Sequence, residues 1–104
     1  MLFLRSMTCT LRGSVSTWGS QASISCTYTA EAGDILFAVG GSPYYNNKYA
    51  EGISFSTETK RIANIGQRPN YAAISVVSGN GTATMSFAGS GSYSLYMSVY
   101  GVHV

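Results

Sequence analysis

The chain has 104 residues, of which only 10% are charged, and its formal net charge at pH 7 is +2. A net charge this small creates no strong attractive field for nucleic acid or for an anionic membrane surface. The composition combines 12 glycines and eight tyrosines with many serines and threonines. Glycine supplies unusual turn dihedrals, while threonine and tyrosine suit a pleated surface. We therefore expect strands joined by tight turns in one domain spanning 1–104, with partners recognised by shape, hydrogen bonds and aromatic contacts.

The apolar opening segment, 1–4, is ended by Arg5 and Ser6. It falls well short of the roughly 7 to 15 apolar residues that form the core of a signal peptide. No apolar run elsewhere approaches the ~20 residues that a helix needs to cross a bilayer. We therefore expect neither an export signal nor membrane insertion.

The first half of the chain alternates apolar and polar side chains with a period of two, which is typical of half-buried strands. The segment 24–29 shows this pattern most clearly, after a turn at 19–21. The uninterrupted apolar run 35–39 is better suited to a central strand covered on both faces than to an edge strand. In the opening segment, the odd-numbered apolar side chains are expected to share one face: Phe3, Met7, Cys9 and Leu11.

The two cysteines, Cys9 and Cys26, both lie in predicted strands. A disulfide between them is geometrically possible. Two cysteines do not make a disulfide-rich secreted scaffold, however, so we favour two buried thiols.

The second half continues as strands with one irregular stretch. We expect a loop over 43–52, a strand over 53–57 and an irregular segment over 58–70, where Gly66 and Pro69 leave little room for a helix. A strand over 71–77 is followed by Asn80-Gly81, which predicts a hairpin into the alternating segment 83–87. A turn at 89–92 then precedes the last strand.

Together these segments predict an all-β fold. About eight short strands spaced by turn residues, with no helical pattern between them, favour an antiparallel β-sandwich of jelly-roll-like form. No internal repeat of roughly 20 to 50 residues is present, so a propeller or solenoid within the chain is not expected.

The last predicted strand, 93–104, is apolar on both faces. An edge strand is usually protected by charge or proline, and neither occurs here. We therefore expect cover on both sides, either because the strand is central in the sandwich or because one face is buried against another copy of the chain. One face carries Leu95, Met97 and Val99, and the face that would lie in the oligomer interface carries Tyr96, Tyr100, Val102 and Val104.

Catalytic and metal-binding patterns are weak. His103 and Asp34 are the one histidine and the one aspartate, and no G-x-S-x-G nucleophile motif occurs. The cysteines and the histidine do not match zinc-ligand spacing, and the glycine-rich segments lack the context of a phosphate-binding loop. We expect no enzymatic activity, no catalytic residues, no metal and no cofactor.

The basic residues Lys60, Arg61 and Arg68 form one cluster in the sequence. Aromatic residues for base stacking are not interleaved with it, so we interpret it as a solvated loop and expect no nucleic-acid partner.

A tyrosine-rich segment within 42–49 is the best candidate for a ligand-binding site. Tyrosine provides a large, rigid face with a hydroxyl group, and asparagine adds adaptable hydrogen bonds, so this composition is common in binding loops. Such a loop could stack on a sugar ring or bind a protein surface; alternatively, some of these tyrosines cap the end of the sandwich. The candidate residues are Tyr44, Tyr45, Asn46, Asn47 and Tyr49.

The Ser/Thr/Gly-rich alternating strands, the turn Ala32-Gly33-Asp34-Ile35-Leu36 and the closing Tyr-rich strand give the chain a resemblance to small β-structured bacteriophage virion proteins, of the fibre-tip or head-decoration type. The resemblance covers most of the chain but includes no diagnostic motif, so it assigns no site residues. It implies a homo-oligomeric assembly unit, often a trimer, that docks on other virion proteins and sometimes contacts host-surface glycans.

Two functions from different classes follow as expectations. The first is a virion structural protein, assembled in the host cytoplasm, which self-associates and docks on a protein lattice. The second is a carbohydrate-binding module, in that case secreted, which uses the tyrosine-rich loop. The first predicts a stable oligomer, and the second predicts a monomer with measurable glycan binding.

Overall fold

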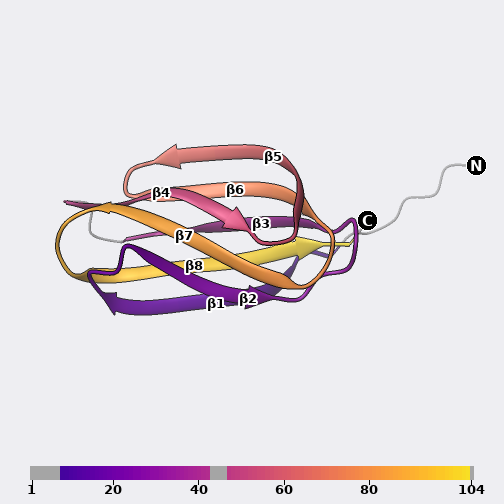
Figure 1. Cartoon of the computed structure of the whole chain (residues 1–104), viewed down its shortest axis with the longest axis horizontal. Coiled ribbons are helices and arrows are strands. Elements are labelled where there is room, and N and C mark those ends of the chain that lie inside the picture. The colour runs from indigo at the N-terminus through magenta and orange to yellow at the C-terminus, as the bar shows by residue number, and fades with distance from the viewer. Residues whose placement is uncertain (1–7, 43–46, 104) are drawn as a thin grey trace, which may run out of the picture.

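Eight strands make up the regular structure of the described residues, 8–42 and 47–103, in the computed structural model (Figure 1). No helix in this part of the chain is long and apolar enough to cross a membrane. The strands are β1 (Thr10–Gly19), β2 (Ser23–Tyr28), β3 (Ile35–Gly41), β4 (Lys48–Phe55), β5 (Glu58–Gln67), β6 (Asn70–Val77), β7 (Gly81–Gly89) and β8 (Tyr93–Val102).

The strands form two antiparallel sheets that pack face to face. Five strands in the order β1-β8-β3-β6-β5 form the large sheet, and three in the order β2-β7-β4 form the small sheet. In Figure 1 the strands of the small sheet cross in front of the large one. Successive strands change sheet at every step except from β5 to β6, which pair as neighbours. Neighbours such as β1 and β8 are therefore distant in sequence, as in the Greek-key connections of a jelly roll. The predicted fold class is confirmed.

The core lies between the sheets and is built from alternate side chains of both. On β8, Leu95, Met97 and Val99 are fully buried, and Leu36 of β3 and Met85 of β7 pack into the same cluster. Full burial of one such side chain contributes roughly 1.5–3 kcal/mol to folding. The alternation predicted for these segments thus selects which side of each strand is interior.

The two apolar segments expected to be central, 35–39 and the last strand, lie at the centre of the large sheet. There β8 pairs with β1 and β3, and β3 also pairs with β6. The expectation that β3 is covered on both faces is wrong for the described chain, because Phe37 points away from the core and remains 37% exposed.

The predicted Asn80-Gly81 hairpin is wrong. β6 belongs to the large sheet and β7 to the small one, so the segment between them crosses from one sheet to the other. Among the described residues no residue other than glycine has a positive φ, and Gly81 does not have one either, so the mirror-image turn that this dipeptide favours is not formed. Instead, Asn80 Oδ1 accepts a hydrogen bond of 2.9 Å from the Ala30 N–H, which fixes the crossing segment against the end of β2.

Two segments are strands where a loop or irregular structure was predicted, although the predicted strand 53–57 does overlap the end of β4 at 53–55. The stretch expected to be irregular, 58–70, contains β5, whose register shifts twice, between Glu58 and Lys60 and between Arg61 and Ala63. Much of the segment expected to be a loop belongs to β4, which has a register shift between Ala50 and Gly52. A bulge places an extra residue in one strand and breaks the period of two, so the pattern of both strands is hidden in the sequence.

A bulge in β1 changes which face of the sheet the first residues of that strand point to. The register of β1 shifts between Leu11 and Gly13, so Leu11 points outward and is 58% exposed while Val15 packs against the core. The expectation that Leu11 and Cys9 face the core is wrong; Phe3 and Met7 lie outside the described residues. Both cysteines are free thiols, but Cys9 is exposed and Cys26 is half-buried, so only the thiol state agrees with the prediction.

Candidate functional site

The outer face of the large sheet is the most unusual surface of the described molecule. In antiparallel pairing, directly opposite residues point to the same side of the sheet. The registers align Leu11, Tyr100, Phe37 and Ile74 in one row across the strands, and Val102, Ile35 and Val76 in the next. We call this outer surface the apolar face; its aliphatic and aromatic members are Leu11, Ile35, Phe37, Val39, Ala63, Ile65, Ala72, Ile74, Val76, Tyr96, Tyr100 and Val102.

The apolar face carries almost no charge. Among the described residues that the register places on it, Lys60 at the β5 corner is the one charged side chain. Its five strands, at a spacing of ~4.8 Å, and a length of about six residues at ~3.3 Å each give a footprint of roughly 500 Å². Within this footprint the outward positions are apolar apart from Lys60, Ser14 and Ser98, and large apolar patches on soluble monomers often mark binding surfaces.

The interface residues predicted from the sequence lie on this face. Tyr96, Tyr100 and Val102 are half-buried on the outer side of β8, and Val104 lies outside the described residues. Sequence reasoning missed the partners that adjoin them on β3 and β6, among them Phe37 and Ile74. The apolar run 35–39 does indicate apolar side chains on both sides of its strand, but the prediction places both sides in the interior of the sandwich.

The outer face of the small sheet has a different chemistry. Here the register brings together only small hydroxyl side chains over most of the three strands, and Ser25 and Thr84 hydrogen-bond across β2 and β7 at 3.1 Å. We call this surface the hydroxyl face; its members are Ser23, Ser25, Thr27, Ser54, Thr82, Thr84 and Ser86.

The tyrosine-rich candidate site is described only in part. Tyr44, Tyr45 and Asn46 lie outside the described residues, while Asn47 is exposed. Tyr49 is half-buried on β4, and the Arg68 guanidinium lies over its ring at 3.4 Å from the centroid. That ring face is therefore occupied within the chain, as a cation–π contact, and would have to lose Arg68 before it could stack on a sugar.

The predicted basic cluster is dispersed in the structure. Arg61 turns toward the sandwich interior, where it bonds Glu58 at 2.5 Å and the Ile53 carbonyl at 2.7 Å. Lys60 faces outward, and Arg68 lies on Tyr49. These three residues do not form a joint cationic patch.

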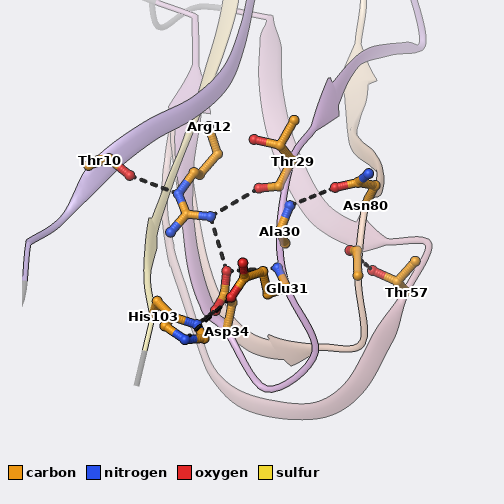
Figure 2. A network of polar contacts seen from close by, with 10 residues as sticks. Thr10, Arg12, Thr29, Ala30, Glu31, Asp34, Thr57, Asn80 and His103 are labelled. Atoms are coloured by element: carbon orange, nitrogen blue, oxygen red, sulfur yellow. Dashed lines mark hydrogen bonds and ion pairs between the residues drawn. The ribbon is translucent and has the colours of Figure 1, made fainter.

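A polar cluster, which we define as Arg12, Glu31, Asp34 and His103, lies at the end of the sandwich where β8 finishes (Figure 2). Asp34 is fully buried. Its Oδ2 accepts hydrogen bonds from Arg12 Nη1 at 3.0 Å and from the Glu31 N–H at 2.9 Å. His103 Nδ1 lies 2.5 Å from the other carboxylate oxygen. The cluster thus connects β1, the β2–β3 turn and the end of β8, and the sequence gives no local signal for it.

Electrostatics hold this cluster in its ionised form. Burial raises the pKa of Asp34, but the hydrogen bonds from Glu31, His103 and Arg12 and the Arg12 charge outweigh burial, and the net pKa lies below the usual value. The pKa of His103 is raised, chiefly by its hydrogen bond to Asp34 and by the Glu31 charge. Both shifts favour the imidazolium–carboxylate pair over the neutral pair.

The cluster does not have the arrangement of a hydrolase. In a Ser-His-Asp triad one imidazole nitrogen binds the carboxylate and the other faces the nucleophile. Here His103 Nε2 lies 3.3 Å from Glu31 Oε2, so a second carboxylate stands where the nucleophile would be.

The same groups have the composition of a metal site, since donor atoms of Glu31, Asp34 and His103 lie within 4.8 Å of one another. Both oxygens of Asp34 are already hydrogen-bonded, and Arg12 contributes a positive charge beside them. These contacts account for the cluster as an ion-pair network that fastens the end of β8.

Comparison of the chain with family models, curated proteins and solved structures finds no match.

Proposed function

We propose that this protein is a non-enzymatic structural subunit that self-associates through the apolar face. The observation that supports the proposal is the row of Leu11, Tyr100, Phe37 and Ile74 at the centre of that face, with no charged neighbour among its register positions. Side chains directed away from the core are not needed to fill the sandwich. Their burial between copies would give each interface an apolar centre, which is typical of stable homo-oligomers.

The edges of the large sheet favour association through the face over pairing of strand edges. β5 is interrupted by two register shifts and carries Lys60 and Arg61, and β1 has one register shift. Bulges and charges on edge strands oppose edge-to-edge pairing. Away from these edge strands, the outward register positions of β8, β3 and β6 carry neither a charge nor a bulge.

The assembly that we propose is a virion, with this chain as a decoration or tail-fibre domain that docks on other virion proteins. The resemblance in strand composition to small bacteriophage virion proteins supports that setting and favours a trimer. The carbohydrate-binding alternative depends on the tyrosine-rich loop, and the one described tyrosine of that loop, Tyr49, has its ring covered by Arg68.

A pair of matched variants tests the proposal. Phe37→Asp puts a carboxylate at the centre of the apolar face, and Thr84→Asp puts the same group at the centre of the hydroxyl face. Because burying an unpaired charge between copies costs several kcal/mol, Phe37→Asp is expected to give monomers, while Thr84→Asp keeps the wild-type mass. Light scattering coupled to size exclusion measures the mass, and circular dichroism checks that both variants fold.

Loss of the oligomer in both variants, or in neither, would show that the apolar face is not the interface. A wild-type chain that is monomeric at micromolar concentration and binds a glycan array would favour the carbohydrate-binding module instead.

A further inference from the structure

Trp18 projects from one edge of the large sheet. It is the one tryptophan of the chain, lies near the end of the edge strand β1 and is 64% exposed. The register pairs it with Ser94 and thereby places it on the same outer side as Tyr96 and Ser16. The large apolar ring of an exposed tryptophan would be stabilised by burial in a pocket. Tryptophans are frequent anchors of protein interfaces for this reason.

A hollow lies near the opposite edge of the same surface. It has a volume of about 280 Å³ and is lined by Val39, Ile65, Gln67, Arg68, Asn70, Tyr71 and Ala72, from β3, the β5–β6 hairpin and its turn. Its floor is apolar, because Val39, Ala72 and Ile65 form one register row across these strands. This volume is slightly below the roughly 300–1,000 Å³ of small-molecule sites and is on the scale of one large aromatic side chain.

The projection and the hollow lie at the same end of the apolar face but on opposite edges. β1 and β5 are the two edge strands, with β8, β3 and β6 between them. At a strand spacing of ~4.8 Å, roughly 19 Å separate the two edges, so Trp18 cannot reach the hollow of its own chain. A second copy presents both features on the same surface, where Arg68 at the hollow and Lys60 at the β5 corner are the charged side chains among the described residues.

We infer that Trp18 of one copy inserts into the hollow of another copy. This inference rests on the proposed function, since it specifies how the apolar faces of two copies engage. The indole ring would lie on Val39, Ala72 and Ile65. At the rim, the exposed Gln67 amide offers an oxygen to the indole N–H, which needs an acceptor once it leaves water. A projection and a hollow on the same face allow every copy to engage a neighbour, and the assembly is closed where the rotation that relates the copies closes.

Because Trp18 is the one tryptophan, its fluorescence reports this contact directly. The experiment dilutes the wild-type full chain from high micromolar to submicromolar concentration and follows emission and iodide quenching together with the mass. We expect a shift to longer wavelength and a several-fold rise in quenching as the oligomer dissociates.

Variants identify the partner of the ring. Trp18→Ala is expected to weaken self-association by at least about tenfold, as for an interface anchor. Ala72→Arg fills the hollow and should both weaken association and leave Trp18 open to iodide at concentrations where the wild type is protected. Thr84→Arg, on the hydroxyl face, is the matched control and should behave as the wild type.

The outcomes separate this inference from the proposed function. An oligomer in which Trp18 stays fully quenchable, or which Trp18→Ala leaves at wild-type affinity, overturns the inference and leaves self-association through the apolar face standing. A wild-type monomer with exposed Trp18 at every concentration overturns both. Protected Trp18 in the wild type and in Thr84→Arg, but not in Ala72→Arg, supports the inference.

Discussion

The apolar face and the hydroxyl face are both outward surfaces of antiparallel sheets, yet they present opposite chemistry. In the small sheet, Met85 of β7 is buried, and the residues on either side of it in sequence, Thr84 and Ser86, point outward. In the large sheet, Leu36 of β3 is buried, and its neighbours in sequence, Ile35 and Phe37, point outward. The core needs only the inward residue of each pair. The outward residue is therefore free to reflect what the surface meets, which is water on the small sheet and, in our proposal, another copy on the large sheet.

The largest expected effect separates inward from outward residues on one strand. Leu36→Ala removes a fully buried side chain and should lower the free energy of unfolding by roughly 2–5 kcal/mol at every protein concentration. Phe37→Ala, one residue further, removes a side chain of the apolar face and should act mainly through dissociation. Its effect should therefore grow with protein concentration, because only the oligomer is stabilised by mass action. Urea unfolding at several concentrations measures both, and equal, concentration-independent losses would contradict the distinction.

A smaller effect is expected at the polar cluster, where stability depends on pH while association should not. Asp34 has a lowered pKa, so its stabilisation is present above the unfolded pKa and is lost as pH falls through the folded pKa. Asp34→Asn should lower the free energy of unfolding by about 2 kcal/mol at neutral pH and reduce the acid loss of stability. His103 has a raised pKa, so its contribution is present in acid and is lost as pH rises through the folded value.

Neither the apolar face nor the hydroxyl face has a carboxylate among its register positions, so the mass of the oligomer should stay constant wherever the chain remains folded. Chemical unfolding and light scattering across the same pH series make the comparison. An oligomer that dissociates in acid before the fold is lost would link assembly to the polar cluster rather than to the apolar face.

The smallest effect is expected on the hydroxyl face. Ser25→Ala removes one solvent-exposed hydrogen bond to Thr84 and should change the free energy of unfolding by less than about 0.5 kcal/mol, with no change in mass. Thermal melts and light scattering check this result. A loss of assembly in Ser25→Ala would mean that the hydroxyl face also contacts another copy.

The sequence predicted the strands, or parts of strands, whose side chains alternate without interruption and missed the stretches beside an extra residue. β2, β6 and β8 keep a period of two, and their buried residues follow from it. β4 shows the alternation only after its register shift, at 53–55, where a strand was predicted, and the two register shifts of β5 hide its alternation altogether. The same effect explains why Leu11 points outward. The bulge after Leu11 exchanges the inward and outward positions of β1, so the side chain lies on the opposite side of the sheet from the one predicted.

Sheet membership and the sites depend on contacts between distant residues. Asn80-Gly81 has the composition of a tight turn. However, β7 pairs with β2 and β4, so the segment before it crosses to the small sheet and forms no hairpin with β6. His103 meets Asp34 across 69 positions, and no local pattern indicates this. On the apolar face only the β8 residues were predicted, because a two-sided apolar strand can be recognised alone, whereas the adjoining rows of β3 and β6 require the register.

The mass of the unmodified chain in solution tests the central claim most directly. Native mass spectrometry or sedimentation at micromolar concentration should give a defined multiple of 11.0 kDa that dissociates on dilution while the strands remain folded. A stable species of 11.0 kDa at that concentration would contradict burial of the apolar face between copies.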